Sequence, residues 1–120
     1  MDLLEVFKDS DDLVDFPADT VIFTEGNEGD HMYVVMKGEV VISLHDKILA
    51  TVLPGQIVGE MALINSKIRS ATVTAKTDCM LALIDQSSFE SLIQHVPEFT
   101  QHVMNVLADR LQVAYDLIEN

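Results

Sequence analysis

The feature that most restricts the fold of this chain is a series of short β-prone runs between Thr20 and Ile84. The runs are rich in Val, Ile, Phe and Thr, which favour pleated backbone. In order they read TVIF, MYVVM, EVVISLH, ILATVL, ATVTA and CMLALI. Turn-forming residues separate them, at Glu25-Gly26-Asn27, Glu28-Gly29-Asp30, Lys37-Gly38, His45-Asp46-Lys47 and Pro54-Gly55. Because no long helix lies between the runs, we expect antiparallel pairing in a barrel or a sandwich.

Helical patterns flank this β-prone region. Between Leu3 and Leu13 the apolar residues are spaced as in a short helix. A chain of 120 residues is long enough to bury one hydrophobic core and too short for two. We therefore expect a single domain, residues 1–120, with a β part at about 16–85 and a helical part at about 86–118.

Two helices are expected after the last strand. Ser87, followed by Glu90 three residues later, matches a capping box at a helix start. Pro97 suits the first turn of a second helix, which we expect from about Glu98 to Leu117. Apolar residues at three- and four-residue spacing form one stripe along it. The stripe consists of Phe99, Val103, Val106, Leu107, Leu111, Ala114 and Ile118.

Charge and composition argue against several classes of partner. The chain has 20 acidic and 7 basic residues, and its formal net charge of -13 repels nucleic acid backbones and anionic lipids. We therefore expect no nucleic acid partner for this chain alone and no membrane association. No apolar run reaches membrane-spanning length, and the first residues carry acids where a signal peptide needs bases. The single cysteine, Cys79, fits a reducing compartment, so the expected location is cytoplasmic.

The stretch from Val58 to Thr74, VGEMALINSKIRSATVT, calls for a chemical explanation. Residues 60–64 can form one helical turn between two strand-like runs, and the first amides of such a turn favour an anion. The planar guanidinium of Arg69 can hold two phosphate oxygens at once, and Ser70 can add a hydroxyl group. The carboxylate of Glu60 is a strong acceptor for a sugar hydroxyl. These residue types suit a nucleotide whose phosphate and sugar lie side by side.

This stretch resembles the phosphate-binding cassette of the cyclic nucleotide-binding domain family, which includes catabolite activator proteins, regulatory subunits of cyclic-AMP-dependent kinase and cyclic-nucleotide-gated channels. FPADTVIFTEGNEGDHMYVVMKGEVVI resembles the family's opening strands and glycine turns, and GEMALINSKIRSATV resembles the cassette. The tail resembles the closing helices. Two positions depart from the family pattern. Ala18-Asp19 stands where a glycine is common, and Ile68 stands where a proline often precedes the cassette arginine.

The resemblance implies an eight-stranded antiparallel β jelly roll with a short N-terminal helix, a short phosphate-binding helix and C-terminal helices. It implies that Glu60 binds the ribose 2′-hydroxyl and that Arg69 binds the cyclic phosphate. The expected ligand-binding set is Gly59, Glu60, Met61, Ala62, Arg69, Ser70 and Ala71. We expect cyclic AMP to be favoured over cyclic GMP. Cyclic GMP stays admissible, because in the family a hydroxyl residue after the cassette arginine can accept the guanine amino group.

The terminal helix is expected to act as a lid that moves toward the barrel when nucleotide binds, because its apolar stripe needs a surface to cover. The resemblance implies which of its residues contact the base. Arg110 or Leu111 would cap the base, with Tyr115 as a further candidate. A permanently docked helix and a dimer seam are the alternatives for this helix. An effector protein and a second copy of the chain are both left open as partners.

Three alternatives compete with nucleotide binding. An ion pair between Arg69 and Glu60 would satisfy both residues without a ligand. A cupin-like metal-binding jelly roll needs clustered His and Glu, whereas the four histidines are scattered and lack metal-site spacing. A protein-interaction domain on the same fold needs no ligand, but the presence of both Glu60 and Arg69 argues against it. Because no catalytic arrangement can be recognised, we expect neither an enzyme nor a metal site.

Overall fold

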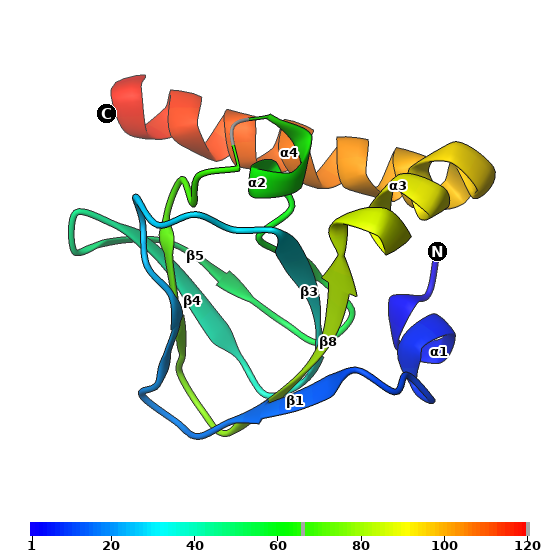
Figure 1. Cartoon of the computed structure of the whole chain (residues 1–120). Helices are drawn as coiled ribbons and strands as arrows, with labels where there is room; N and C mark the ends of the chain where they lie inside the picture. The colour runs from blue at the N-terminus through cyan, green and yellow to red at the C-terminus, as the bar shows by residue number, and fades with distance from the viewer. Residues whose placement is uncertain (66, 120) are drawn as a thin grey trace. The chain divides into compact units, whose positions relative to one another are not determined.

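The structure is a computed structural model that describes residues 1–65 and 67–119. The chain divides into a β unit, residues 2–86, and a helical unit from residue 87 onward, with which Met1 is grouped. Figure 1 traces the elements in chain order. They are α1 (Leu3–Phe7), β1 (Leu13–Phe16), β2 (Val21–Phe23), β3 (His31–Lys37), β4 (Val40–Leu44), β5 (Lys47–Val52), β6 (Ile57–Val58), α2 (Met61–Ile64), β7 (Thr72–Ala75), β8 (Cys79–Asp85), α3 (Gln86–His95) and α4 (Pro97–Glu119).

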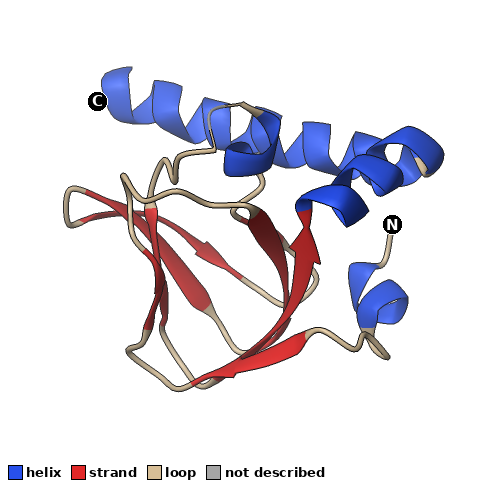
Figure 2. Cartoon of the chain, in the orientation of Figure 1, coloured by secondary structure: helices blue, strands red, loops and turns tan. Residues whose placement is uncertain are grey.

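The β unit consists of two four-stranded sheets, whose strands are drawn in red in Figure 2. The strand order is β1-β8-β3-β6 in one sheet and β2-β7-β4-β5 in the other. Every pairing is antiparallel, and strands distant in sequence lie side by side, such as β1 with β8 and β2 with β7. This order is typical of a jelly roll. The expected eight-stranded antiparallel fold is therefore confirmed within the described part of the chain.

Apolar side chains from both sheets fill the interior of the β unit. Val35, Val40, Val58 and Leu81 have no exposed surface and belong to one cluster of buried residues. Cutting back one such side chain, as in Leu81→Ala, is expected to destabilise the fold by about 2–5 kcal/mol. The packed core holds the strand ends from which the candidate site is built.

The N-terminal segment differs in part from the sequence-based expectation. Helix α1 begins after Asp2, whose side chain accepts hydrogen bonds from the amides of Leu4 and Glu5. The expected helix to Leu13 is wrong in its second half, because α1 ends at Phe7 and Leu13 begins β1. Pairing with β8 holds these residues extended, a tertiary constraint that local apolar spacing does not reveal. Strands β1 and β6 are additions to the six predicted runs.

The departure at Ala18-Asp19 is accommodated by a tight turn. Asp19 adopts a left-handed conformation with φ of 70°, a region that Asp tolerates better than most residues with a side chain. Its amide donates to the carbonyl oxygen of Ala75 at 2.7 Å. The turn therefore forms without a glycine.

The helical unit contains most of α3 and the whole of α4. Pro97 is the first residue of α4, as expected, and the Thr100 hydroxyl donates to the carbonyl oxygen of Ile93 at 2.8 Å. The rings of Phe89 and Phe99 meet edge to face with centroids 6.1 Å apart. The capping box predicted Ser87 as the residue that precedes the helix, but α3 already begins at Gln86, so Ser87 lies inside its first turn. Strand β8 continues directly into α3 and leaves no separate cap segment. None of the helices in residues 1–65 and 67–119 has the length and apolar character needed to cross a membrane.

Candidate functional site

The chain between β6 and α2 forms one wall of the candidate site. Gly59 follows β6 with φ of +83°, a left-handed conformation that glycine adopts without strain. Glu60 takes the N-cap position of α2 and has no exposed surface. The carbonyl oxygen of Leu63 accepts a hydrogen bond from the Gln86 side chain at 3.2 Å, which holds this short helix in place. The expected helical turn at residues 60–64 is thereby confirmed, with Met61–Ile64 as the helix.

Main-chain hydrogen bonds fix the opposite wall, where the loop after β2 meets the segment that carries Arg69. The Arg69 amide donates to the carbonyl oxygen of Asn27 at 2.7 Å, and the Gly26 amide donates to that of Arg69 at 2.9 Å. The Gly29 amide donates to the carbonyl oxygen of Lys67 at 2.8 Å. Because the bonds run in both directions, the backbone of Arg69 is held on the loop like a short extra strand.

The side chain of Arg69 is buried between these walls. Only 3% of its surface is exposed, and its Cζ atom lies 4.0 Å from the ring centroid of Phe23. Its Nη1 atom donates to the carbonyl oxygen of Gly59 at 3.1 Å. Its Nε atom is also buried and has no acceptor in the described part of the chain. The guanidinium is therefore held in place with donor capacity left over.

Burial lowers the pKa of Arg69, while Tyr33, Asp30 and Glu60 act in the opposite direction. An arginine normally titrates so far above neutrality that it stays charged despite such a shift. The site thus contains a partly desolvated cation. Among the ion pairs formed by the described residues none includes Arg69, so the Arg69–Glu60 pair of the first alternative does not form at ion-pair distance.

Two glycines make room for the guanidinium. A Cβ atom on Gly29 would overlap Nε and Cζ of Arg69 and would lie 2.8 Å from its Cδ. A Cβ atom on Gly59 would lie 2.7 Å from Nη1 and 3.2 Å from the Phe23 ring. The sequence predicts Gly59 in the site and assigns Gly29 only to a turn. Its backbone is not left-handed, so close approach to Arg69 is the physical reason for a glycine there.

The other predicted ligand residues lie close by. Ser70 is exposed, and its hydroxyl donates to the sulfur of Met61 at 3.6 Å. Ala62 is buried on α2, and Ala71 is partly buried against the core cluster. Phe23 was missed, because nothing in the TVIF run separates a ring that supports an arginine from an ordinary core residue.

The residues proposed to cap the base belong to α4, in the helical unit. Leu111 and Tyr115 are each 52% exposed, and Arg110 is partly buried. Arg110 also has at least one interaction within the chain. These exposures describe the side chains themselves and leave their role in ligand binding a prediction.

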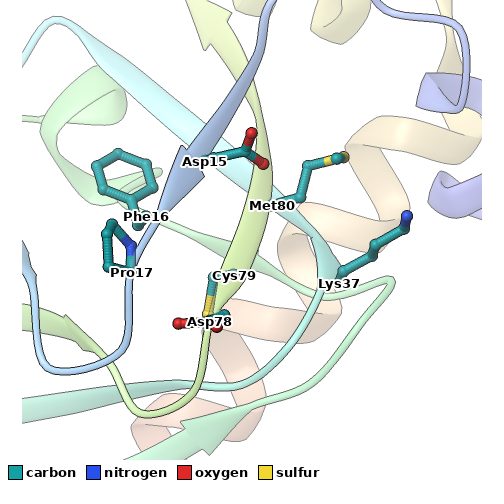
Figure 3. Close-up of a pocket in the computed structure, with 7 residues that line it drawn as sticks. All are labelled: Asp15, Phe16, Pro17, Lys37, Asp78, Cys79 and Met80. Atoms are coloured by element: carbon teal, nitrogen blue, oxygen red, sulfur yellow. The ribbon is translucent and has the colours of Figure 1, made fainter.

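A surface hollow of about 410 Å³ lies elsewhere on the β unit and contains none of the predicted ligand residues. Figure 3 shows its lining, which comes largely from β1 and β8. Two carboxylates, Asp15 and Asp78, and a single ammonium group, Lys37, border it. This charge balance disfavours an anion, so the hollow does not compete with the Arg69 site for a phosphate. Among residues 1–65 and 67–119, no group of three or more His, Cys, Asp and Glu side chains could hold a metal ion.

The described part of the chain is thus a jelly roll with an apolar core, and the buried cation Arg69 lies between the two walls of the candidate site. The family model described as cyclic nucleotide-binding domain matches residues 13–96. The chain therefore belongs to the cyclic nucleotide-binding domain family, a class of regulatory ligand-binding modules.

The chain is similar to known proteins of several kinds, among them a transcriptional regulator and an EAL enzyme. The cAMP-activated global transcriptional regulator CRP of Salmonella typhimurium is 31% identical over 111 residues, which cover 88% of this chain and 53% of the regulator. PKAR CBD2 with bound Sp-2Cl-cAMPS is 26% identical, with a TM-score of 0.77, covering 95% of this chain and 84% of that one. The cAMP-bound EAL enzyme Bd1971 is 38% identical, with a TM-score of 0.66, covering 89% and 30%. The same enzyme in its cGMP-bound form gives 37% and 0.67, covering 89% and 31%. The chain spans about half or less of the length of the curated relatives it matches first.

Proposed function

We propose that this chain binds a 3′,5′-cyclic nucleotide, with Arg69 holding the cyclic phosphate and Glu60 the ribose. The observation that carries the proposal is the guanidinium of Arg69, which is 3% exposed and whose buried Nε lacks an acceptor among the described residues. Burying a charged donor without a full set of partners is unfavourable. A phosphate placed against the guanidinium supplies the missing acceptors and the opposite charge.

The expected strength of the phosphate contact follows from its chemistry. Each charged hydrogen bond contributes about 1.5–3 kcal/mol, and a bidentate pair also fixes the orientation of the phosphate. The ring of Phe23 and the backbone of Gly29 pack against the Arg69 side chain and already restrict it in the free protein. Arg69 therefore loses little side-chain conformational entropy when the ligand binds.

Glu60 supports the assignment of the sugar. Its carboxylate lies beside Gly59 with no exposed surface, and its charge acts on the guanidinium of Arg69. A carboxylate accepts hydrogen bonds and donates none, so it favours a hydroxyl-bearing group over a second phosphate. A phosphate bound to Arg69 with a ribose hydroxyl turned toward Glu60 uses both residues.

Cyclic AMP is the proposed preferred ligand, with cyclic GMP as a weaker one. Ser70, directly after Arg69, is exposed and offers a hydroxyl that could accept from a guanine amino group. The relative Bd1971 is described in both cAMP-bound and cGMP-bound forms, which supports proposing both nucleotides as ligands.

The C-terminal helix is the proposed output element, in line with residues 1–120 acting as one regulatory domain. Leu111 and Tyr115 on α4 are half exposed and so can exchange water for a bound base. The proposal assigns no catalytic residues to the chain and no nucleic acid binding of its own, in line with its net charge of -13. The expectation of a cytoplasmic location stays a prediction.

Calorimetry with cyclic AMP, cyclic GMP and linear 5′-AMP tests the assignment. The wild type is expected to bind both cyclic nucleotides and to discriminate against 5′-AMP, whose dianionic phosphate lacks the ring geometry. Arg69→Leu should abolish measurable binding, whereas Lys67→Ala, a nearby cation that is exposed, serves as the matched control. Equal affinity of the two variants would overturn the role of Arg69. A thermal shift series with cyclic nucleotides and divalent metals separates nucleotide binding from the metal-binding and ligand-free alternatives.

A further inference from the structure

His31, the first residue of β3, bridges two side chains near the candidate site. Its Nδ1 atom lies 2.8 Å from Oδ1 of Asp30, and its Nε2 atom lies 2.9 Å from the hydroxyl oxygen of Tyr33. Asp30 and Tyr33 are both near enough to Arg69 to act on its pKa. The sequence alone gives no reason to distinguish His31 from the other three histidines.

The partners determine which atoms donate in the neutral ring. An ionised carboxylate can only accept, so Nδ1–H donates to Asp30 and Nε2 accepts from the Tyr33 hydroxyl. The hydrogen bond from His31 lowers the pKa of Asp30, while burial raises the pKa of Tyr33. Asp30 therefore stays ionised and Tyr33 keeps its hydroxyl proton throughout the pH range in which a histidine titrates; the Tyr33 oxygen accepts from Nε2–H once the ring is protonated.

Each partner of His31 is connected to one of the two walls that enclose the Arg69 side chain. Asp30 follows Gly29, the residue that packs against the guanidinium of Arg69. Tyr33 is 6% exposed and is paired across the sheet with Val58, which precedes Gly59. The bridge through His31 therefore stiffens the junction between the glycine loop and β3, the strand whose pairing with β6 positions Gly59.

We propose that His31 is a positioning residue of the phosphate site and makes ligand affinity depend on pH. This inference rests on the proposed function, because it concerns the same ligand. Loss of the bridge frees the Gly29–Asp30 segment to move relative to β3, and the guanidinium that touches Gly29 moves with it. Protonation keeps the bond to Asp30 and adds a positive charge near the bound anion.

The charged and titratable groups around His31 decide the sign of the pH effect. They are Asp30 beside it, Tyr33 two residues along β3, Asp85 opposite it on β8, and Arg69 beyond the glycine loop. Asp30 stays ionised while the ring gains its proton, so the surroundings of the guanidinium become more positive as the pH falls. An anion therefore binds more tightly at lower pH, and we expect about a two- to fivefold gain in affinity between pH 8 and pH 6.

The test measures the Kd of cyclic AMP and cyclic GMP by calorimetry between pH 5.5 and 8. The proteins are the wild type, His31→Gln, His31→Asn and the matched control His95→Gln, which alters an exposed histidine of α3. His31→Gln should weaken binding by about three- to tenfold at pH 7 and should remove the pH dependence. His31→Asn can still donate to Asp30, so it should regain part of the affinity but none of the pH dependence. His95→Gln should match the wild type.

A second measurement needs no variant in the bridge. The His31 ring resonances of the wild-type protein are followed against pH by NMR, without nucleotide and with saturating cyclic AMP. Linkage requires the midpoint of this titration to move to higher pH in the complex, because proton and anion favour each other. Binding by the wild type together with unchanged affinity and pH profile in His31→Gln, or an unmoved midpoint, overturns this inference and leaves the proposed function intact. Failure of the wild type to bind either nucleotide overturns both.

Discussion

Substitution of Gly29 by alanine tests whether the lack of a side chain at this position is what makes room for the guanidinium of Arg69. The new Cβ atom would lie 2.8 Å from Cδ of Arg69 and closer still to Nε and Cζ. Ordinary contacts of this kind are near 3.5–4.0 Å, so the guanidinium must retreat by more than about 1 Å. A shift of that size disrupts at least one charged hydrogen bond to a phosphate, worth about 1.5–3 kcal/mol. The expected loss of nucleotide affinity is about 10- to 100-fold.

The stability of the free protein gives a second readout of the same contact. Gly29 lies outside the left-handed region, so alanine at this position strains no backbone and by itself should stabilise the fold by about 0.4–1 kcal/mol. In the wild-type background the overlap with Arg69 should reverse that gain. In an Arg69→Ala background the space is empty, so Gly29→Ala should be neutral or stabilising. Denaturant unfolding of the four proteins yields the coupling energy, expected to exceed about 1 kcal/mol.

Gly55→Ala is the matched control for Gly29→Ala. Gly55 has φ of +89°, and its nearest neighbour to an added Cβ is Leu4 at 3.7 Å, an ordinary contact. Alanine there should destabilise the fold by about 1–2 kcal/mol through backbone strain and should leave the Kd unchanged. Wild-type affinity in Gly29→Ala, or additive unfolding energies in the cycle with Arg69→Ala, would refute the reasoning.

Four further predictions concern the ligand, the pH and the helical unit. Arg69→Leu should weaken cyclic nucleotide binding by more than about 100-fold and Lys67→Ala by less than about threefold, because only Arg69 offers a buried bidentate donor; calorimetry compares them. Ser70→Ala should reduce the affinity for cyclic GMP and leave that for cyclic AMP unchanged in a competition assay, and parallel losses for both would contradict a contact to the guanine amino group. Burial lowers the pKa of His102 from its usual 6.5, so the unfolded chain binds the proton more readily than the folded one. The free energy of unfolding should therefore fall as the pH drops below about 6.5, and thermal unfolding should show a weaker pH dependence in His102→Gln. Hydrogen exchange over residues 98–118 should slow when nucleotide saturates the protein, and unchanged protection would make α4 a scaffold rather than a lid.

The strands and the ligand residues were predictable to different degrees. Val40–Leu44 and Cys79–Asp85 follow from dense β-branched and apolar runs, and the antiparallel order follows from the lack of long crossovers. The two-residue strand Ile57–Val58 was not predictable, because so short a run carries no period. Strand Leu13–Phe16 was missed since Asp15 interrupts it and its partner lies far along the chain.

Within the candidate site, the residues proposed to contact the ligand were predictable from the sequence, whereas the residues that hold the Arg69 side chain in place were not. Arg69 and Glu60 stand out because a charged donor and acceptor flank one helical turn and have small residues beside them, namely Gly59, Ala62, Ser70 and Ala71. Gly29 and Phe23 precede Arg69 by 40 and 46 residues, and they meet it only in the folded chain, through the pairing of β2 with β7 and of the following loop with residues 67–69. The sequence EGD suggests a turn, and the absence of a left-handed φ at Gly29 is visible only in the structure.

The most direct test of the central claim observes the buried guanidinium itself. The chain has only two arginines, Arg69 and Arg110, so a spectrum of arginine Nε–H groups contains two signals, and Arg110→Lys assigns them. The account predicts that saturating cyclic AMP shifts the Arg69 Nε–H proton signal downfield and slows its exchange with water, because the free donor gains a charged acceptor. An Arg69 signal unchanged in position and exchange, in protein shown by calorimetry to be saturated, would contradict the claim that Arg69 holds the phosphate.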